Sequence, residues 1–279
     1  MGWNITDDLE TYAAGAGEFL RANPAENTVP LGLIETLRAQ GEDAFGDGPL
    51  FGWWRSGTDG VRGACLQTGS YPLLLSAMPE EAAADLAGVL ADRSLRGVNG
   101  DAPAARAFAA AWEHHTGTAP EVRMRQRLYR LEELEIPEPL PPGTARAGIA
   151  ADRDLVRAWF TAFEEEAMGP ASDSSAMADD RLDYGGIALW ELDGTPVSMA
   201  GRTRIVSGMT RIGPVYTPPE HRRRGYGAAV TAVLTASAME AGATEVVLFT
   251  DLANPTSNSV YLRIGYRAVS DRLVLAFAR

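Results

Sequence analysis

Apolar residues recur at helical spacing in the first part of the chain, and shorter apolar runs follow. The spacing between Asp7 and Gln40 predicts two helices, separated by the helix-breaking pair Asn23-Pro24. The next runs are bounded by Gly, Ser and Asp, which is typical of consecutive antiparallel strands. Those strands are expected at residues 50–54, 63–68 and 71–78. The first half then continues with a helix at 79–92, a strand at 95–98, a helix at 102–115 and a strand at 122–131.

Four prolines, at positions 137, 139, 141 and 142, interrupt this pattern near the middle of the chain. Proline fixes its own φ angle and has no backbone N–H, so the segment can continue neither a helix nor a central strand. We therefore expect one domain at residues 1–135, a stiff linker at 136–144 and a second domain at 145–279.

The second half repeats the order of elements found in the first half. A polar stretch at 172–183 separates its first helix from a hairpin turned by Asp193-Gly194. The strands are expected at 145–150, 187–192, 196–203, 211–217, 246–250 and 273–278, and the helices at 152–168, 226–241 and 257–264. Two similar orders on either side of a linker suggest an ancient duplication.

Composition narrows the class of protein. Hydrophobic residues make up 46% and charged residues 22% of the chain, which is typical of a globular protein. The net charge of -12 disfavours general affinity for nucleic acid or for an anionic membrane. The same charge would attract a cationic small molecule or peptide, although acidity that serves only solubility is the alternative.

Cysteine and histidine content argues against a disulfide and against a metal site. The single cysteine, Cys65, is interpreted as a core residue, and the three histidines have no zinc-site spacing. No apolar stretch approaches the roughly 20 residues that cross a bilayer, and no targeting segment is recognisable. We therefore expect a cytoplasmic protein without a metal.

A basic, glycine-containing turn follows the predicted strand that ends at Val215-Tyr216-Thr217 and precedes a predicted helix. It reads Arg222-Arg223-Arg224-Gly225-Tyr226-Gly227. The first amides of a helix and its dipole bind anions, and glycines let the backbone approach the ligand, so a polyphosphate is expected. A dinucleotide fingerprint would need Gly or Ala where the chain has Val230, and a nucleoside-triphosphate loop would need Gly-Lys-Ser/Thr.

Arg222, Gly225 and Gly227 match Arg/Gln-x-x-Gly-x-Gly/Ala, and with this match the chain resembles the GNAT superfamily of acetyltransferases. A second block, from Asp251 to Tyr266, is similar to the family's Asn…Asn-x-x-Tyr-x-x-x-Gly-Tyr/Phe region. The resemblance covers about residues 145–279 and is closest to bacterial members. It implies an α/β (α+β) fold of tandem GNAT-like domains, each a mixed, mostly antiparallel sheet flanked by helices.

The resemblance also implies acetyl-CoA as the co-substrate. Backbone groups of Val215, Tyr216 and Thr217 would pair with the pantetheine arm like an added strand. The amides of Arg223, Arg224, Gly225, Tyr226, Gly227 and Ala228 would hold the pyrophosphate, and Arg222 to Arg224 would add charge. Asn254 and Asn258 would contact the cofactor or position the helix. For the arginines, a solvated charge is the alternative, and for Asn258 a helix-terminal polar residue.

The implied reaction is direct attack by a neutral amine on the acetyl carbonyl, without a covalent enzyme intermediate. Tyr261 would protonate the leaving thiolate, with a core tyrosine as the alternative. The general base is not identifiable, because the strand at 211–217 contains no carboxylate. His221 is interpreted as a loop residue. Carboxylates from segments that often line the acceptor pocket are Glu164, Glu165, Glu166, Asp183 and Glu191, each with an exposed charge as the alternative.

The first half lacks this motif where the repeated pattern would place it. Its strand at 71–78 leads into Pro79-Glu80-Glu81, and no Asn-x-x-Tyr follows Val98. We therefore expect a degenerate acetyltransferase-like domain that has lost cofactor binding. A protein-interaction domain of unrelated fold is the alternative.

These observations together predict an N-acetyltransferase that transfers the acetyl group of acetyl-CoA to a primary amine of a small molecule or of an amino-acid or peptide acceptor. We expect a monomer or homodimer that binds neither nucleic acid nor membrane. The alternative is a non-catalytic acetyl-CoA sensor. Tyr261 argues against a sensor, because a sensor needs no acid beside the sulfur.

Overall fold

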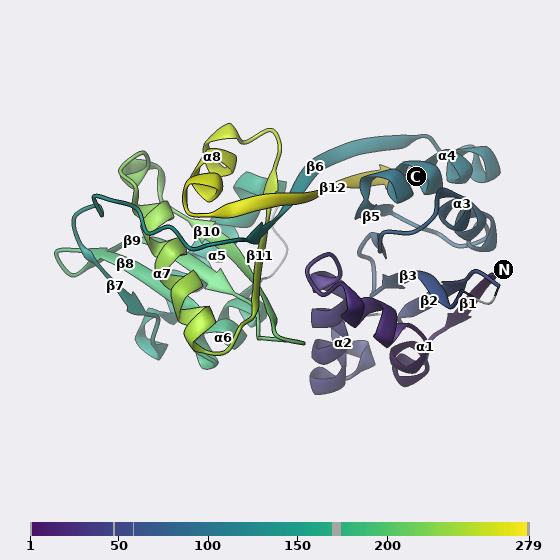
Figure 1. Ribbon diagram of the computed structural model, residues 1–279, viewed down its shortest axis with the longest axis horizontal. Coiled ribbons are helices and arrows are strands. Elements are labelled where there is room, and N and C mark those ends of the chain that lie inside the picture. Colours follow the sequence, from purple (N-terminus) through teal and green to yellow (C-terminus); the bar gives the residue numbers. More distant parts are fainter. Residues whose placement is uncertain (1, 47, 58, 169–173, 278–279) are drawn as a thin grey trace. The chain divides into compact units, whose positions relative to one another are not determined.

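The computed structural model describes residues 2–46, 48–57, 59–168 and 174–277 (Figure 1). The chain forms two compact units, each of which has its own core. Unit 1 comprises Met1–Leu128, Thr250–Asn254 and Val269–Arg279, and unit 2 comprises Tyr129–Phe249 and Pro255–Ala268. Among the helices that the structure describes, none combines the length and hydrophobicity that a membrane span requires.

Unit 1 is a mixed sheet with helices packed on it. Its strands are β1 (Gly2–Thr6), β2 (Leu50–Arg55), β3 (Val61–Gln67), β4 (Leu73–Leu75) and β5 (Gly97–Asp101), in the order β1-β2-β3-β4-β5-β12. Its helices are α1 (Leu9–Ala22), α2 (Thr28–Gln40), α3 (Glu80–Val89) and α4 (Ala102–Thr116), with a 3-10 turn, η1, at Glu42–Phe45. Only the β4–β5 pair is parallel among the strand pairs recorded in this unit.

The apolar spacing of α1 explains its position in unit 1. Leu9, Tyr12, Ala16 and Leu20 recur at three- and four-residue intervals and are all buried. The helix begins at Asp8, whose side chain accepts a hydrogen bond from the Thr11 amide at 2.6 Å. The buried stripe packs on β2 and β3.

Unit 2 contains a similar layered arrangement. Its strands are β7 (Thr144–Ala147), β8 (Ile187–Leu192), β9 (Thr195–Arg202), β10 (Met209–Tyr216) and β11 (Glu245–Asp251), in the order β11-β10-β9-β8-β7. Its helices are α5 (Arg153–Met168), α6 (Ser175–Asp183), α7 (Tyr226–Glu240) and α8 (Pro255–Arg263), with 3-10 turns η2 (Ala150–Asp152) and η3 (Pro219–His221). β10 and β11 are parallel, and the pairs from β10 to β7 are antiparallel.

Alternate residues of β8 face opposite layers of unit 2. Ala188 and Trp190 belong to the core beneath α7, whereas Ile187 and Leu189 belong to the core beneath α5 and α6. The sheet therefore lies between α7 on one face and α5 with α6 on the other (Figure 1).

The structural units divide the chain at different points from the expected 1–135, 136–144 and 145–279. The linker belongs to unit 2, where the Pro142 carbonyl accepts a hydrogen bond from Trp190 Nε1 at 3.0 Å. Strands β6 (Pro120–Leu131) and β12 (Tyr266–Phe277) each contribute residues to both units, as β11 does. In unit 1, residues 272–276 of β12 pair with β5. A strand supplied by the far end of the chain cannot be recognised from local pattern.

The predicted fold class is confirmed, and most predicted elements are present with shifted ends. Among the described α-helices and strands, β1, the first half of β12 and α6 were not predicted. The polar stretch at 172–183 forms helix α6 from Ser175 onward, while its first two residues lie outside the described part of the chain. Ion pairs with Arg153 and Arg157 of α5, rather than a wide apolar face, hold α6 in place.

Candidate functional site

Strand β10 separates from β11 halfway along its length. The parallel pairing joins Met209–Ile212 to Glu245–Leu248, and β10 then continues to Tyr216. On its other side, the pairing of β10 with β9 shifts register between Ile212 and Val215. A bulge of this kind redirects the strand. Among the residues that the structure describes, the β11-facing edge of β10 has no ladder partner after Ile212, which suits an added extended ligand.

The predicted basic turn connects β10 to α7 through two left-handed residues. Arg223 has φ 62° and Gly225 has φ 87°, a conformation that glycine adopts without steric cost. Gly225 is the N-cap residue of α7, and the first helical bond runs from the Ala229 amide to the Gly225 carbonyl at 3.1 Å. The amides that precede Ala229 are therefore the free first donors of the helix, at the positive end of its dipole. This geometry suits the pyrophosphate contact predicted for Arg223 to Ala228.

Gly227 lies in the first turn of α7 and faces the end of β10. A Cβ atom there would stand 3.4 Å from Thr217 Oγ1 and 4.0 Å from Val215 Cγ1, which are ordinary contact distances. Glycine inside a helix costs about 1 kcal/mol relative to alanine. The protein itself therefore gains nothing from glycine at this position, whereas a ligand that approaches the backbone closely would need it.

Arg222 fastens the turn to its surroundings. Its Nε donates to the Thr217 carbonyl at 2.8 Å, and its Nη2 lies 2.7 Å from both carboxylate oxygens of Glu166 on α5. Its guanidinium also lies 5.8 Å from the Tyr216 ring centroid. Arg222 therefore already has a counter-charge. Arg223 and Arg224 are exposed and form no ion pair among the described residues.

Tyr261 lies on α8, the helix formed by the second sequence block. Its side chain is 9% exposed and packs edge-on against Tyr266, with ring centroids 6.3 Å apart. Tyr266 is held in turn by a hydrogen bond of 2.8 Å between its hydroxyl and Thr235. Burial raises the pKa of Tyr261 to about 12, so its hydroxyl keeps its proton at neutral pH. This state suits a proton donor.

The two asparagines have structural contacts. Asn258 Oδ1 accepts a hydrogen bond from the Tyr129 hydroxyl at 2.9 Å, which ties α8 to β6. The Asn254 amide donates to the Asp251 carbonyl at 3.0 Å, just before α8 begins. Asn258 thus positions its helix. Cofactor contact by either residue remains a prediction.

Three of the candidate carboxylates are paired with arginines. Glu166 contacts Arg222, Asp183 contacts Arg153 at 3.0 Å, and Glu191 contacts Arg146 at 2.7 Å. Each pair neutralises the carboxylate's charge, so none of the three stands out as a free base.

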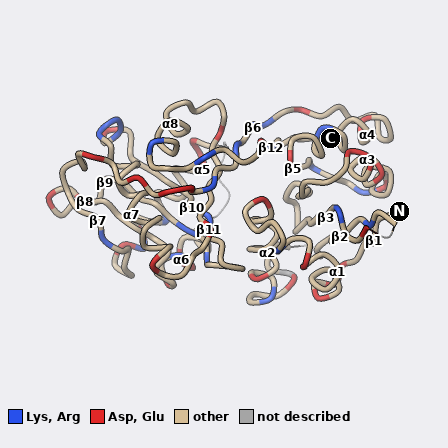
Figure 2. Tube along the Cα trace, viewed as in Figure 1, with Lys and Arg blue, Asp and Glu red and all other residues tan. Residues whose placement is uncertain are grey.

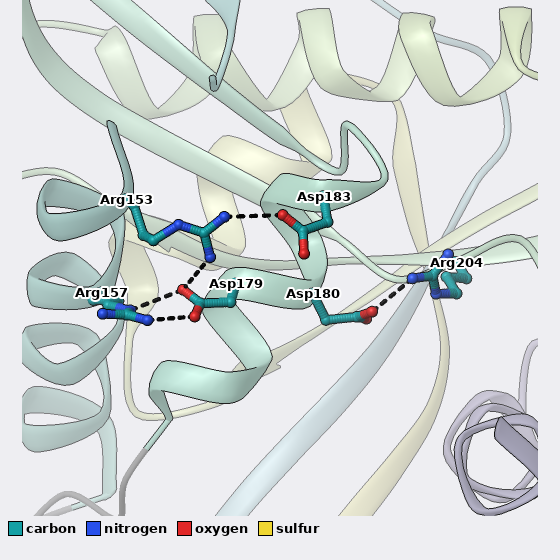
Figure 3. A network of polar contacts seen from close by, with 6 residues as sticks. All are labelled: Arg153, Arg157, Asp179, Asp180, Asp183 and Arg204. Carbon is teal, nitrogen blue, oxygen red and sulfur yellow. Dashed lines mark hydrogen bonds and ion pairs between the residues drawn. The ribbon is translucent and has the colours of Figure 1, made fainter. Parts of the chain in front are cut away.

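The Asp183–Arg153 pair belongs to a network that joins α6 to α5 (Figure 3). Arg153 and Arg157 both contact Asp179, at 3.0 and 2.8 Å, and these contacts lower the pKa of Asp179, chiefly through the hydrogen bond from Arg157. The network explains how a polar segment forms a packed helix.

Arg181 on α6 is a residue of this region that sequence reasoning did not identify. It is 6% exposed and donates through Nη1 to the carbonyl of Gly213 in β10. One signal was present, because Arg181 shares a helical stripe with the buried residues Ala178 and Leu182. A charged residue in an apolar stripe indicates a buried partner.

The corresponding strand-to-helix junction of unit 1 differs in charge. Helix α3 follows Pro79 and begins with Glu80 and Glu81, without an arginine or glycine turn. A cavity of about 590 Å³ lies there, lined by Phe19, Val61, Arg62, Ala77, Met78, Pro79 and Glu81. Carboxylates at the start of a helix oppose a second anion. This junction is therefore unsuited to a pyrophosphate.

Comparisons with known proteins support the same fold. Residues 192–275 match the family model described as FR47-like protein. No curated protein matches the chain. A GCN5-related N-acetyltransferase from Sphaerobacter thermophilus is similar with a TM-score of 0.63 and 17% identity, over 98% of this chain and 94% of that one.

Two further solved structures extend over most of the chain. A GCN5-related N-acetyltransferase from Kribbella flavida has a TM-score of 0.56 and 22% identity, over 89% of this chain and 96% of its own. A tandem GNAT protein from the clavulanic acid biosynthesis pathway has a TM-score of 0.57 and 12% identity, over 99% and 98%. At these identities, the likeness establishes the fold.

Proposed function

We propose that this chain, which has the tandem GNAT acetyltransferase fold and an FR47-like segment, transfers the acetyl group of acetyl-CoA directly to a primary amine. The proposal rests on one observation in unit 2: the open edge of β10 leads directly to the free amides at the start of α7. The edge of β10 opens after Ile212, and the same strand leads through the turn at Gly225 into the free amides of α7. An extended arm that ends in a pyrophosphate fits this sequence of partners.

Residues at the end of β10 and at the start of α7 bind different parts of acetyl-CoA. Val215 to Thr217 offer backbone groups to the pantetheine arm, and the amides before Ala229 hold the pyrophosphate. Arg223 and Arg224 add positive charge from the surface, while Arg222 holds the turn against β10 and α5.

The chemical step needs a neutral amine beside the thioester. The amine nitrogen attacks the acetyl carbonyl, the C–N bond forms and the C–S bond breaks. The amine loses its proton to water or to a base, and Tyr261 protonates the leaving thiolate. Tyr261 carries its proton at neutral pH, and burial, which raises its pKa to about 12, extends the protonated form to higher pH.

The direct test is release of free thiol from acetyl-CoA in the presence of a panel of primary amines. The sequence contains no lysine, so every basic position in Figure 2 is an arginine. The protein therefore offers no lysine side chain as an acceptor, and background from self-acetylation is confined to a terminal amine. Amine-dependent thiol release that decreases in Tyr261→Phe supports the proposal. Binding of acetyl-CoA without transfer to any amine favours a sensor, and no binding contradicts both functions.

A further inference from the structure

A cluster of arginines surrounds Tyr184 where α6, β8 and β9 meet in unit 2. The guanidinium carbons of Arg202 and Arg204 lie 5.7 and 4.3 Å from the Tyr184 ring centroid. Arg181 joins the same junction through the backbone, because its carbonyl accepts from Gly186 at 2.7 Å and the Gly186 carbonyl accepts from Arg202 at 2.8 Å. We call Arg202 and Arg204, which both contact the Tyr184 ring, the arginine cluster. The Arg181 guanidinium lies on the α5 side of the sheet, over Phe160.

The arginine cluster carries more positive charge than its neighbours neutralise. Arg202 is 8% exposed and forms no ion pair with a carboxylate in the described part of the chain. Asp180 contacts Arg204 at 2.6 Å. Arg202 Nε is buried and has no hydrogen-bond partner among the described residues. Buried charge without a counter-charge is costly, so it points to a ligand that completes the site.

The arginine cluster lies beside the point where β10 opens. Arg202 pairs in register with Ile212, the last residue of β10 that is paired with β11. Arg181 donates to the carbonyl of Gly213, the next residue along the strand. Its guanidinium also lies 5.3 Å from the Phe160 ring centroid, which fixes it between α5 and the sheet. The backbone of Arg202 therefore lies one strand away from the point where β10 opens, which is where the proposed reaction needs the thioester.

We infer that the arginine cluster binds an anionic group of the acceptor, so that the substrates are primary amines that also carry a carboxylate or a phosphate. This inference rests on the proposed function. Guanidinium groups match the planar geometry of both anions and bind them through charge-assisted hydrogen bonds. Asp180 serves as the counter-ion of Arg204 until the acceptor's anion replaces it. The net charge of -12 would favour cationic acceptors at long range, but the local charge selects the bound group.

The test compares acceptors that differ only in their anion. ω-Amino carboxylates are paired with their carboxamides, and aminoalkyl phosphates with the matching amino alcohols. Transfer is measured as kcat/KM, and binding to the protein without acetyl-CoA is measured by calorimetry. Arg202→Met keeps most of the aliphatic volume and removes the charge. Arg130→Met is the control, because Arg130 is an exposed residue of unit 2 whose side chain forms no hydrogen bond or ion pair within the described part of the chain.

We expect the anionic member of each pair to be preferred about 10- to 100-fold, the range for hydrogen bonds to charged groups. Arg202→Met should reduce this preference toward equal use of the anionic and neutral members of each pair, whereas Arg130→Met should keep it. Equal use of both members, or an equal loss for both in Arg202→Met, would overturn the inference while leaving the acetyltransferase intact.

Calorimetry separates this inference from the proposed function. Binding of the amino carboxylate that is lost in Arg202→Met but not in Arg130→Met, without any transfer, would support the anion site and contradict the transferase. If neither the amino carboxylate nor the aminoalkyl phosphate binds at millimolar concentration while neutral amines are acetylated normally, the anion site is overturned and the transferase is supported.

Discussion

Unit 1 and unit 2 follow a similar order of elements, yet they differ at the strand that would hold the cofactor. In unit 1, β4 has three residues, and all of them pair with β5. The two strands approach so closely that a Cβ at Gly100 would stand 2.6 Å from Leu75 Cβ. In unit 2, β10 has eight residues, and its pairing with β11 ends at Ile212. The same fold is therefore closed in one unit and open in the other.

The helices that follow these strands differ in charge. α3 begins with Glu80 and Glu81, whose carboxylates already occupy the positive end of its dipole. α7 begins after Arg222-Arg223-Arg224 and has Gly227 in its first turn. The comparison teaches that an anion site depends on a few residues at a strand-to-helix junction rather than on the fold.

The largest expected effect comes from making the α7 junction resemble that of α3. Gly227→Glu places a carboxylate among the free amides, where it favours the helix but opposes a pyrophosphate. We expect acetyl-CoA affinity to fall at least ~100-fold, because juxtaposed like charges cost several kcal/mol. The melting temperature should not decrease. Equilibrium binding and thermal unfolding measure the two quantities.

Gly227→Gln is the matched control for Gly227→Glu, since it adds the same bulk without charge. Its affinity should lie between those of the wild type and Gly227→Glu. If both variants bind acetyl-CoA as the wild type does, the pyrophosphate is not held at α7.

The next largest effect concerns the proton donor, for which unit 1 has no counterpart in its sequence. Tyr261→Phe should lower kcat about 100-fold, the low end for general acid catalysis, and leave the KM for acetyl-CoA nearly unchanged. Steady-state kinetics with one amine measure both constants. An unchanged kcat would show that Tyr261 is a core residue and not the proton donor.

The pH dependence of the reaction tests the same hydroxyl. A proton donor must be protonated, and burial raises the pKa of Tyr261 from 10.0 to about 12. The rate should therefore rise with pH as the amine loses its proton, and Tyr261 should cause no decline near pH 10. A decline near pH 10 in the wild type that disappears in Tyr261→Phe would contradict this role of burial.

A smaller effect is expected at the contact that fastens the turn. Arg222→Met should weaken acetyl-CoA binding about threefold to tenfold and lower the free energy of unfolding by less than about 1 kcal/mol, because the ion pair is half exposed. Glu166→Gln breaks the same pair from α5 and should reproduce part of the loss. A double-mutant cycle measures their coupling, and strictly additive effects would show that the pair does not hold the turn.

The smallest effect is expected in unit 1. Glu81→Gln removes one carboxylate from the α3 junction but supplies neither an open strand nor a glycine turn. Acetyl-CoA binding and kcat should stay within twofold of the wild type, roughly the scatter of surface substitutions. Binding of a second acetyl-CoA molecule by this variant would show that the negative charge at α3 alone prevents unit 1 from binding the cofactor.

Sequence patterns predicted the elements that carry local signals and missed those held by distant partners. The turn around Gly225 was recognisable because its glycines and arginines are adjacent in the chain. Helix α6 was not, since its packing depends on Arg153 and Arg157 of α5. The pairing of β12 with β5 was equally hidden, as it joins residues that are far apart in sequence.

The roles of single site residues show the same limit. The motif identified Arg222, but only the structure shows that its charge is taken by Glu166. No local pattern could place Arg202 beside Ile212, because the register of two strands decides that contact. Neither the sequence nor the structure identifies the general base, because three of the five candidate carboxylates, Glu166, Asp183 and Glu191, are ion-paired.

The most direct test of the account is calorimetric titration of the full chain with acetyl-CoA. The account predicts one molecule bound per chain, with binding lost in Gly227→Glu and retained in Glu81→Gln. Two molecules bound per chain, or one that Gly227→Glu still binds with wild-type affinity, would contradict the claim that the α7 junction of unit 2 holds the cofactor.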